Sequence, residues 1–125
     1  MERLQAEVRG AFDRPEELVF GRLAALPYLT ACLKEVLRIY PPVPVGAPRL
    51  IPAGGKRILD RWLPPGTHVA VHHYAASHAP ANFADPDAFA PGRWLPEGGE
   101  GAYAGDVREA SQPFSWGHRN CLGQK

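Results

Sequence analysis

Residues 114–123 read FSWGHRNCLG, which places Cys121 between two glycines and two positions after an arginine. A cysteine thiolate is a strong ligand for soft metal ions and for haem iron. Gly117 and Gly123 would allow tight turns and the close approach of a flat cofactor, because glycine has no Cβ and adopts positive φ angles. Arg119 is permanently charged and could bind a carboxylate. The segment therefore predicts a cofactor site with Cys121 as the ligand, and the alternative is a buried cysteine in a glycine-rich turn.

The same ten residues fit the pattern Phe-x-x-Gly-x-Arg-x-Cys-x-Gly, which begins at Phe114. This pattern resembles the haem-binding loop of the cytochrome P450 family, whose cysteine is the axial ligand of the iron. The resemblance implies haem as the cofactor and Cys121 as its iron ligand, and an aromatic ring at Phe114 could pack beneath the haem. Every fixed position of the pattern is filled: Phe114, Gly117, Arg119, Cys121 and Gly123.

The composition indicates an ordered chain with much irregular backbone. Its 125 residues include 14 prolines and 13 glycines, yet 45% are hydrophobic and three are tryptophans, which a disordered chain rarely carries. A net charge of +1 argues against a general nucleic-acid binder. Two cysteines do not make the disulfide framework of a secreted protein, and no apolar run is long enough to cross a membrane.

A helix is predicted over residues 26–40, where apolar residues recur at helical period. Pro27 suits the first turn, because its missing N–H costs nothing there, and the prolines at 41–42 end the helix. Glu35 and Arg38 share a face and, taken alone, would form a surface ion pair. The sequence KEVLRIYPP resembles the cytochrome P450 helix with the Glu-x-x-Arg motif, which implies that the pair is buried and structural.

Before this helix, apolar residues at four-residue spacing predict a short amphipathic helix over residues 1–12, with Glu7 exposed. Asp13 and Glu16 have the spacing of a capping box. A second short helix and a solvated turn are equally good interpretations of that segment.

The proline-rich segment 43–49 is unsuited to a central strand. The resemblance implies that this turn lines the substrate pocket, so that Val43, Val45 and Ala47 could contact the substrate. It also implies that Arg49 binds a haem propionate. An exposed strand arginine is the alternative for Arg49 from the residues alone.

A β-hairpin region is predicted over residues 49–71. The turn at 53–55 would return the strand 56–59, and residues 67–71 alternate polar and apolar side chains as a half-buried strand does. A short helix is predicted over 72–78. Four histidines in this region invite a zinc interpretation, but no acidic or cysteine ligand lies nearby at metal spacing.

Residues 83–113 resemble the meander that precedes the cysteine loop of cytochromes P450. The resemblance implies that Arg93 joins Glu35 and Arg38 in a Glu-Arg-Arg triad. A carboxylate buried between two guanidiniums is acceptable only when its charged hydrogen bonds are well formed. Residues 95–112 are glycine-rich and polar, and they predict a surface loop.

The predicted fold is α+β, mainly α with short β-hairpins and long ordered loops, in a single incomplete domain over residues 1–125. It resembles the C-terminal part of a cytochrome P450 domain, most closely that of fungal microsomal members. We expect the distal helices, an N-terminal membrane anchor and the helix that follows the cysteine loop to lie outside this chain.

The resemblance implies a haem-thiolate monooxygenase that inserts one atom of O2 into a small hydrophobic organic substrate. Electrons would come from an NADPH-dependent flavoprotein reductase, and no nucleic acid is expected as a partner. The intact enzyme would lie on the cytosolic face of the endoplasmic reticulum membrane, and the chain alone is expected to be inactive. Two alternatives are a non-catalytic truncated fragment and a small haem- or metal-binding module that uses Cys121 alone.

Overall fold

The computed structural model describes residues 2–124, so Met1 and Lys125, the ends of the predicted domain, lie outside the described residues. The predicted mainly helical chain with short antiparallel strands is confirmed. The α-helices are α1 (Glu2–Ala11), α2 (Phe20–Ala24), α3 (Pro27–Ile39) and α4 (His73–His78). The strands are β1 (Arg49–Leu50), β2 (Lys56–Ile58), β3 (Arg61–Leu63) and β4 (His68–Val69). Short 3₁₀ turns are Pro15–Glu17, Pro91–Trp94, Pro96–Gly99, Arg108–Ala110, Gly117–Arg119 and Leu122–Gln124.

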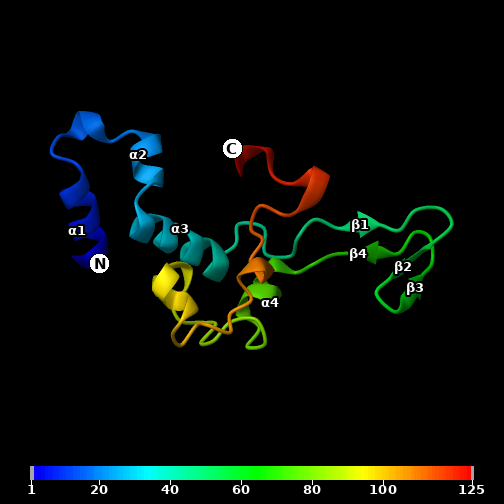
Figure 1. Cartoon of the computed structure of the whole chain (residues 1–125). Coiled ribbons are helices and arrows are strands. Elements are labelled where there is room, and N and C mark those ends of the chain that lie inside the picture. The colour runs from blue at the N-terminus through cyan, green and yellow to red at the C-terminus, as the bar shows by residue number, and fades with distance from the viewer. Residues whose placement is uncertain (1, 125) are drawn as a thin grey trace.

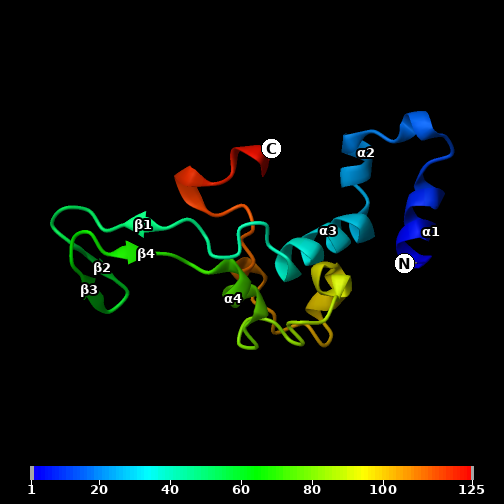
Figure 2. The same cartoon turned by 180° about the vertical axis from the view of Figure 1, so that it is seen from behind.

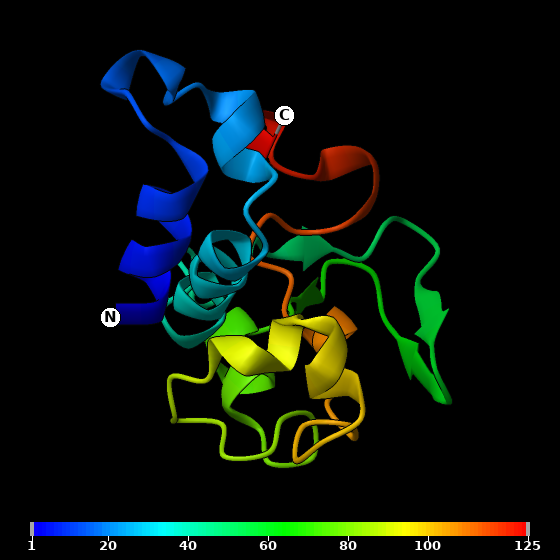
Figure 3. The same ribbon diagram turned by 60° about the vertical axis from the view of Figure 1, so that its left-hand side comes forward.

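The helix α3 stands at the centre of the arrangement. Figures 1 and 2 show α1 and α2 at one end of the molecule and the strands at the other. α3 packs against α1, α2, α4 and the 3₁₀ turn Pro91–Trp94. In Figure 3 the loops that follow α4 lie on one side of α3, and the C-terminal segment lies on the opposite side. α3 therefore lies between the loops after α4 and the cysteine loop.

Glu7 of α1 is not exposed as predicted, because it caps α3. Its two carboxylate oxygens accept hydrogen bonds of 2.8 Å from the backbone N–H groups of Tyr28 and Leu29. The first N–H groups of a helix have no partner within the helix, and a carboxylate there also suits the helix dipole. Leu26, at the N-cap of α3, supplies no side-chain cap of its own. Periodicity within α1 could not reveal this partner, which lies 21 residues away.

The segment after α1 forms a 3₁₀ turn rather than a capped helix. The N-cap position is Arg14, which makes no capping hydrogen bond, so the capping box predicted for Asp13 and Glu16 does not form. Glu17 instead accepts a hydrogen bond of 2.7 Å from Arg22. Of the two interpretations left open by the sequence, the structure has the turn.

The strands pair differently from the predicted hairpin. β1 pairs with β4, with Arg49 opposite Val69, and β2 pairs with β3. The β2–β3 hairpin turns at Leu59 and Asp60, and Leu59 has a φ of 53°. The glycine turn at 53–55 therefore separates two sheets instead of closing one. The sequence has no glycine or asparagine at the true turn, which removes the usual signal for a two-residue hairpin.

The core is small and includes charged side chains as well as hydrophobic ones. Its buried hydrophobic residues are Ala31, Ile51, Phe83 and Leu95, and the charged side chains of the predicted triad are fully buried with them. The burial of Leu95 corrects the prediction that residues 95–112 form only a surface loop. No helix within residues 2–124 has the length and apolar character needed to cross a membrane.

Candidate functional site

The cysteine loop is closed by its own backbone. The N–H of Cys121 donates a hydrogen bond of 2.8 Å to the carbonyl of Phe114, and the N–H of Asn120 donates one of 3.1 Å to the carbonyl of Gly117. Cys121 is exposed and its thiol is free. The loop therefore presents the sulfur at the surface, where a flat cofactor could approach it.

The two glycines of the loop have different roles. Gly117 has a φ of 83°, which agrees with the need for positive φ in this turn. Gly123 does not have a positive φ, so that part of the prediction is wrong. A Cβ at Gly123 would lie 3.7 Å from the Sγ of Cys121, an ordinary contact distance. Gly123 therefore keeps the neighbourhood of the sulfur open, while the second residue with positive φ is Ser115, at 65°.

The other predicted residues of the loop differ in exposure. Arg119 is exposed at the end of the 3₁₀ turn Gly117–Arg119. Phe114 is half-buried and lines a cavity of about 210 Å³ together with Lys34 and Trp94. The loop thus carries a cation and an aromatic ring on the same short segment as the thiol, a set that fits a large, flat, anionic cofactor with a soft metal.

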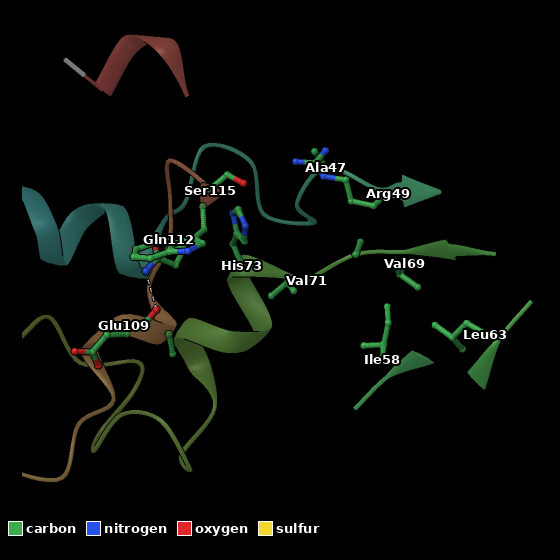
Figure 4. A pocket seen from close by; sticks show the side chains of 13 residues that line it. Ala47, Arg49, Ile58, Leu63, Val69, Val71, His73, Glu109, Gln112 and Ser115 are labelled. Carbon is green, nitrogen blue, oxygen red and sulfur yellow. Dashed lines mark hydrogen bonds between the residues drawn. The ribbon is translucent and has the colours of Figure 1, made fainter. Parts of the chain in front are cut away.

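A larger cavity of about 520 Å³ lies between the strands and the start of the cysteine loop. Arg49 and Ala47 line it, and Ser115 and Trp116 of the cysteine loop form another part of its wall (Figure 4). The structure thus places Arg49 near the cysteine loop, although 72 positions separate it from Cys121 in the sequence. Apolar side chains supply the rest of the lining near the strands: Ile58, Leu63, Val69 and Val71.

Only one of the three predicted substrate-contacting residues lines this cavity. Ala47 does, whereas Val43 and Val45 are 49% and 57% exposed and are outside the lining within the described residues. The structure adds His73, one of the four histidines between positions 68 and 78 that invite a zinc interpretation. His73 is 8% exposed and lines the cavity.

Glu35 is the centre of a buried charged network. Its Oε1 accepts hydrogen bonds from Arg38 Nη2 at 2.9 Å and from Arg93 Nε at 3.1 Å. Its Oε2 accepts from Arg38 Nε at 2.9 Å and from Trp94 Nε1 at 2.8 Å. The backbone N–H of Ala90 adds a further bond to Oε1 at 2.9 Å. The carboxylate thus accepts five hydrogen bonds while its side chain is fully buried.

The remaining N–H groups of Arg38 bind the backbone that follows α4. Arg38 Nη1 donates to the carbonyls of Ser77 at 2.7 Å and Pro86 at 2.6 Å, and Nη2 donates to Ala88 at 3.1 Å. A single arginine on α3 therefore fixes the end of α4 and the first part of the meander. Because these acceptors are backbone carbonyls, no sequence motif could have named them.

Arg93 has a carboxylate partner that the sequence did not reveal. Its Nη1 donates to Asp106, and its Nη2 donates to the carbonyl of Ala84 at 3.1 Å. The other oxygen of Asp106 accepts the N–H of Ala84 at 2.7 Å. Asp106 lies in the stretch predicted as a polar surface loop, so its buried role corrects that prediction.

The hydrogen bonds decide the ionisation of Glu35. Burial alone would raise the pKa of this carboxyl group. The hydrogen bonds from Arg38, the Ala90 N–H and Trp94, together with the charge of Arg38, outweigh burial and lower the pKa of Glu35 below its ordinary value. The network therefore keeps the carboxylate of Glu35 ionised to a lower pH than that of an ordinary glutamate.

Comparison with known proteins gives consistent similarities over nearly the whole chain. The family model described as "Cytochrome P450" matches residues 1–125. The chain is 49% identical over 118 residues to cytochrome P450 monooxygenase atr2 of Stereocaulon alpinum, covering 94% of this chain and 23% of that protein. It is 50% identical over 123 residues to cytochrome P450 monooxygenase ABA2 of Pyricularia oryzae strain Y34, covering 98% of this chain and 29% of that protein.

Solved structures give the same picture. A zebrafish cytochrome P450 with abiraterone superposes with a TM-score of 0.77 at 31% identity, covering 98% of this chain and 27% of that one. Retinoic acid-bound cyanobacterial CYP120A1 superposes with a TM-score of 0.75 at 28% identity, covering 98% of this chain and 27% of that one. The chain therefore spans about a quarter of the length of the relatives that it matches.

Proposed function

Because this chain belongs to the cytochrome P450 family, we propose that it supplies the iron-ligating loop and the buried charged network of a haem-thiolate monooxygenase. The observation that carries the proposal is the exposed, free thiol of Cys121 in a loop closed by the hydrogen bond to Phe114. The relatives named as cytochrome P450 monooxygenases support the reaction class. Since the chain spans about a quarter of their length, we place this activity in a full-length protein that carries the chain.

The residues around Cys121 fit a haem with two carboxylate side chains. The Sγ of Cys121 would bind the iron, and the rings of the haem would lie over the half-buried Phe114. Arg119 and Arg49 would bind the propionates, because guanidinium groups form charge-assisted hydrogen bonds with carboxylates. When bound, haem with a thiolate ligand supplies one-electron and O2 chemistry and favours cleavage of the O–O bond. Gly117 and Gly123 keep the backbone and the sulfur accessible.

The substrate class that we propose is a small hydrophobic organic molecule. The cavity beside the cysteine loop has an apolar wall, to which Ala47 contributes. Two solved relatives contain such molecules, namely abiraterone and retinoic acid. Val43 and Val45 lie on the same segment as Ala47 and are exposed. They would contact substrate only when further parts of a full-length protein cover them.

The role that we propose for Glu35, Arg38 and Arg93 is structural. Their hydrogen bonds tie α3 to the end of α4 and to the segment from Ala84 to Asp106. This segment leads directly into the cysteine loop. The network would therefore hold the backbone from which the iron ligand is presented, without taking part in the reaction.

The remaining partners follow from the family. We propose that electrons reach the haem from an NADPH-dependent flavoprotein reductase and that O2 is the second substrate. We also propose the cytosolic face of the endoplasmic reticulum membrane as the location of the full-length protein.

Replacement of each cysteine in the full-length protein tests the proposal. Cys121→Ser is expected to abolish haem-dependent turnover with reductase and NADPH, since the iron would lose its thiolate. Cys32→Ser is the matched control, because Cys32 is the other free cysteine and lies on α3. Equal product formation by the Cys121→Ser variant and the unaltered protein would refute the proposed ligand.

A further inference from the structure

We propose that His73 is an additional residue of the cofactor site, where it donates a hydrogen bond to a haem propionate that Arg49 also binds. This inference rests on the proposed function above, because it requires that haem is the cofactor. Neither the Glu-x-x-Arg motif nor the cysteine loop contains His73. Burial, hydrogen bonding and the shape of the larger cavity lead to it.

The imidazole of His73 is a buried polar group without a partner. His73 is 8% exposed. Its Nδ1 is enclosed and has no hydrogen-bond partner among the described residues. Buried polar atoms are nearly always hydrogen-bonded, and an unpaired one costs stability. The enclosed Nδ1 is therefore an unpaired acceptor, and Nε2 is the ring nitrogen through which His73 can bind a group in the adjacent cavity.

The position of His73 is fixed by the backbone around it. The N–H of Tyr74 donates a hydrogen bond of 2.9 Å to the carbonyl of Pro44, which holds the start of α4 against the proline-rich segment. Gly46 has a φ of 67°, and a Cβ there would lie only 2.1 Å from the carbonyl oxygen of Val71. The same Cβ would lie 3.6 Å from Nε2 of His73. A glycine at position 46 thus allows the segment that leads to Arg49 to pass close to the imidazole.

The two ring nitrogens have different surroundings. Buried N–H groups without an acceptor are rarer than unpaired buried acceptors, so we assign the hydrogen to Nε2 rather than to the enclosed Nδ1. Unlike Nδ1, Nε2 is not an enclosed atom without a partner. Figure 4 shows the imidazole projecting from α4 toward Ser115 and the segment that carries Ala47. Nε2–H is therefore a donor available to a group in the cavity.

A carboxylate is the ligand that suits this cavity. Arg49 gives the lining a cation, and a carboxylate accepts up to about four hydrogen bonds, more than one arginine fork provides. Gln112 already donates through Nε2 to the carbonyl of Glu109 at 2.9 Å. Glu109 also lines the cavity, and Figure 4 shows its carboxylate directed away from Arg49. His73 is thus a donor for a carboxylate held by Arg49. The hydroxyl of Ser115 and the indole N–H of Trp116 are further donors in the same lining.

The cysteine loop identifies the carboxylate as that of the cofactor. Ser115 and Trp116, which precede Cys121 by six and five positions, line the same cavity as His73 and Arg49. A haem bound to Cys121 has two propionates at its edge, so one of them can enter this cavity. A carboxylate on the substrate would offer the same chemistry, and haem retention measured without substrate separates the two sources.

The test compares haem retention in the full-length, haem-loaded protein and its variants. His73→Leu removes both ring nitrogens, while His73→Gln places an amide N–H near the position of Nε2. His72→Leu is the matched control, because His72 is the exposed neighbour and makes no capping hydrogen bond. The rate of haem transfer to excess apomyoglobin is measured without substrate, for protein reconstituted with haem or with haem dimethyl ester, whose propionates carry no charge.

With haem, His73→Leu should release the cofactor about tenfold faster than the unaltered protein, as expected for the loss of one hydrogen bond to a charged group. His73→Gln should restore most of the retention, and His72→Leu should change nothing. With the dimethyl ester, the unaltered protein and His73→Leu should release at similar rates. A purely structural role for His73 would instead accelerate release equally for both cofactors.

Equal release of haem by His73→Leu and the unaltered protein would overturn the proposal, as would the same acceleration with the ester. An effect of His73→Leu seen only with carboxylate-bearing substrates would assign the residue to the substrate instead. If His73→Leu fails to fold, His73→Phe keeps an aromatic ring without either nitrogen, and the propionate bending band in its resonance Raman spectrum must shift; an unchanged band contradicts the contact. Failure of the proposed function is recognised separately, because Cys121→Ser would then keep a thiolate-type haem spectrum.

Discussion

The Nε of Arg93 lies 3.1 Å from the Oε1 of Glu35, 58 positions earlier in the chain, and both side chains are fully buried. This contact joins the central helix to the meander. Arg38 completes the arrangement from the same helix as Glu35, at 2.9 Å. A buried carboxylate between two guanidiniums stabilises the fold only while all its partners are present, since removal of one leaves an unpaired charge.

Replacement of the carboxylate of Glu35 should therefore strongly destabilise the folded protein. We expect Glu35→Ala to lower the free energy of unfolding of the full-length protein by about 3–5 kcal/mol, because two guanidiniums lose their counter-charge. The matched control is Glu97→Gln, which breaks an ion pair with Arg3 at 3.4 Å whose side chains are 60% and 65% exposed. That change should cost at most about 1 kcal/mol. Chemical denaturation of both variants gives the comparison, and normal stability of Glu35→Ala would contradict the structural role.

The lowered pKa of Glu35 predicts that the stability of the folded protein decreases in acid. The pKa of Glu35 in the folded protein is below its ordinary value of 4.5, so the unfolded chain binds a proton more readily. The contribution of Glu35 is therefore complete above that value and is lost as the pH falls through the folded pKa. Denaturation at a series of pH values should show a steeper loss of stability below pH 4.5 for the unaltered protein than for Glu35→Gln. Parallel profiles would show that another group controls the acid transition.

Glu7 should stabilise the start of α3. Glu7→Ala removes both acceptors of the Tyr28 and Leu29 N–H groups, and we expect a loss of about 1–2 kcal/mol. Glu16→Gln, at an exposed position in the turn Pro15–Glu17, is the control and should be nearly neutral. Amide hydrogen exchange at Tyr28 and Leu29 provides a local readout. Unchanged protection in Glu7→Ala would mean that the cap is dispensable.

The exposed apolar face of α3 should make the isolated 125-residue chain prone to aggregation. Leu33 and Val36 are 57% and 50% exposed, so an apolar stripe has no cover within the described residues. Expressed alone, residues 1–125 should aggregate, retain haem weakly and show no turnover with haemin, reductase and NADPH. Leu33→Lys should increase the soluble fraction of the isolated chain. Gel filtration and thermal unfolding check this, and a soluble, active monomer with a sharp transition would refute the expectation.

Local patterns in the sequence are sufficient to predict the helix and the chemistry of the loop. The apolar period and Pro27 locate α3, and the ten-residue pattern around Cys121 identifies the candidate ligand. These features depend on neighbours within a few positions. The same reasoning brings Glu35, Arg38 and Arg93 together only through resemblance to a family, because spacing alone does not relate positions 35 and 93.

The features that sequence reasoning missed depend on long-range contacts. Glu7 looked exposed by its position on α1, but its partners belong to α3. Asp106 lies in a glycine-rich stretch and is recognisable only once Arg93 is placed beside it. The true hairpin turn contains Leu59 at a φ of 53°, a conformation that leucine rarely adopts. In each case tertiary packing outweighed the local preference.

The central claim is that Cys121 supplies the thiolate to the haem iron, and the reduced carbon monoxide spectrum tests it most directly. The full-length protein should show the red-shifted absorption band that is typical of a thiolate-ligated haem–carbon monoxide complex. Cys32→Ser should keep this band, and Cys121→Ser should lose it while any bound haem absorbs at shorter wavelength. An unchanged thiolate-type band in Cys121→Ser would contradict the account.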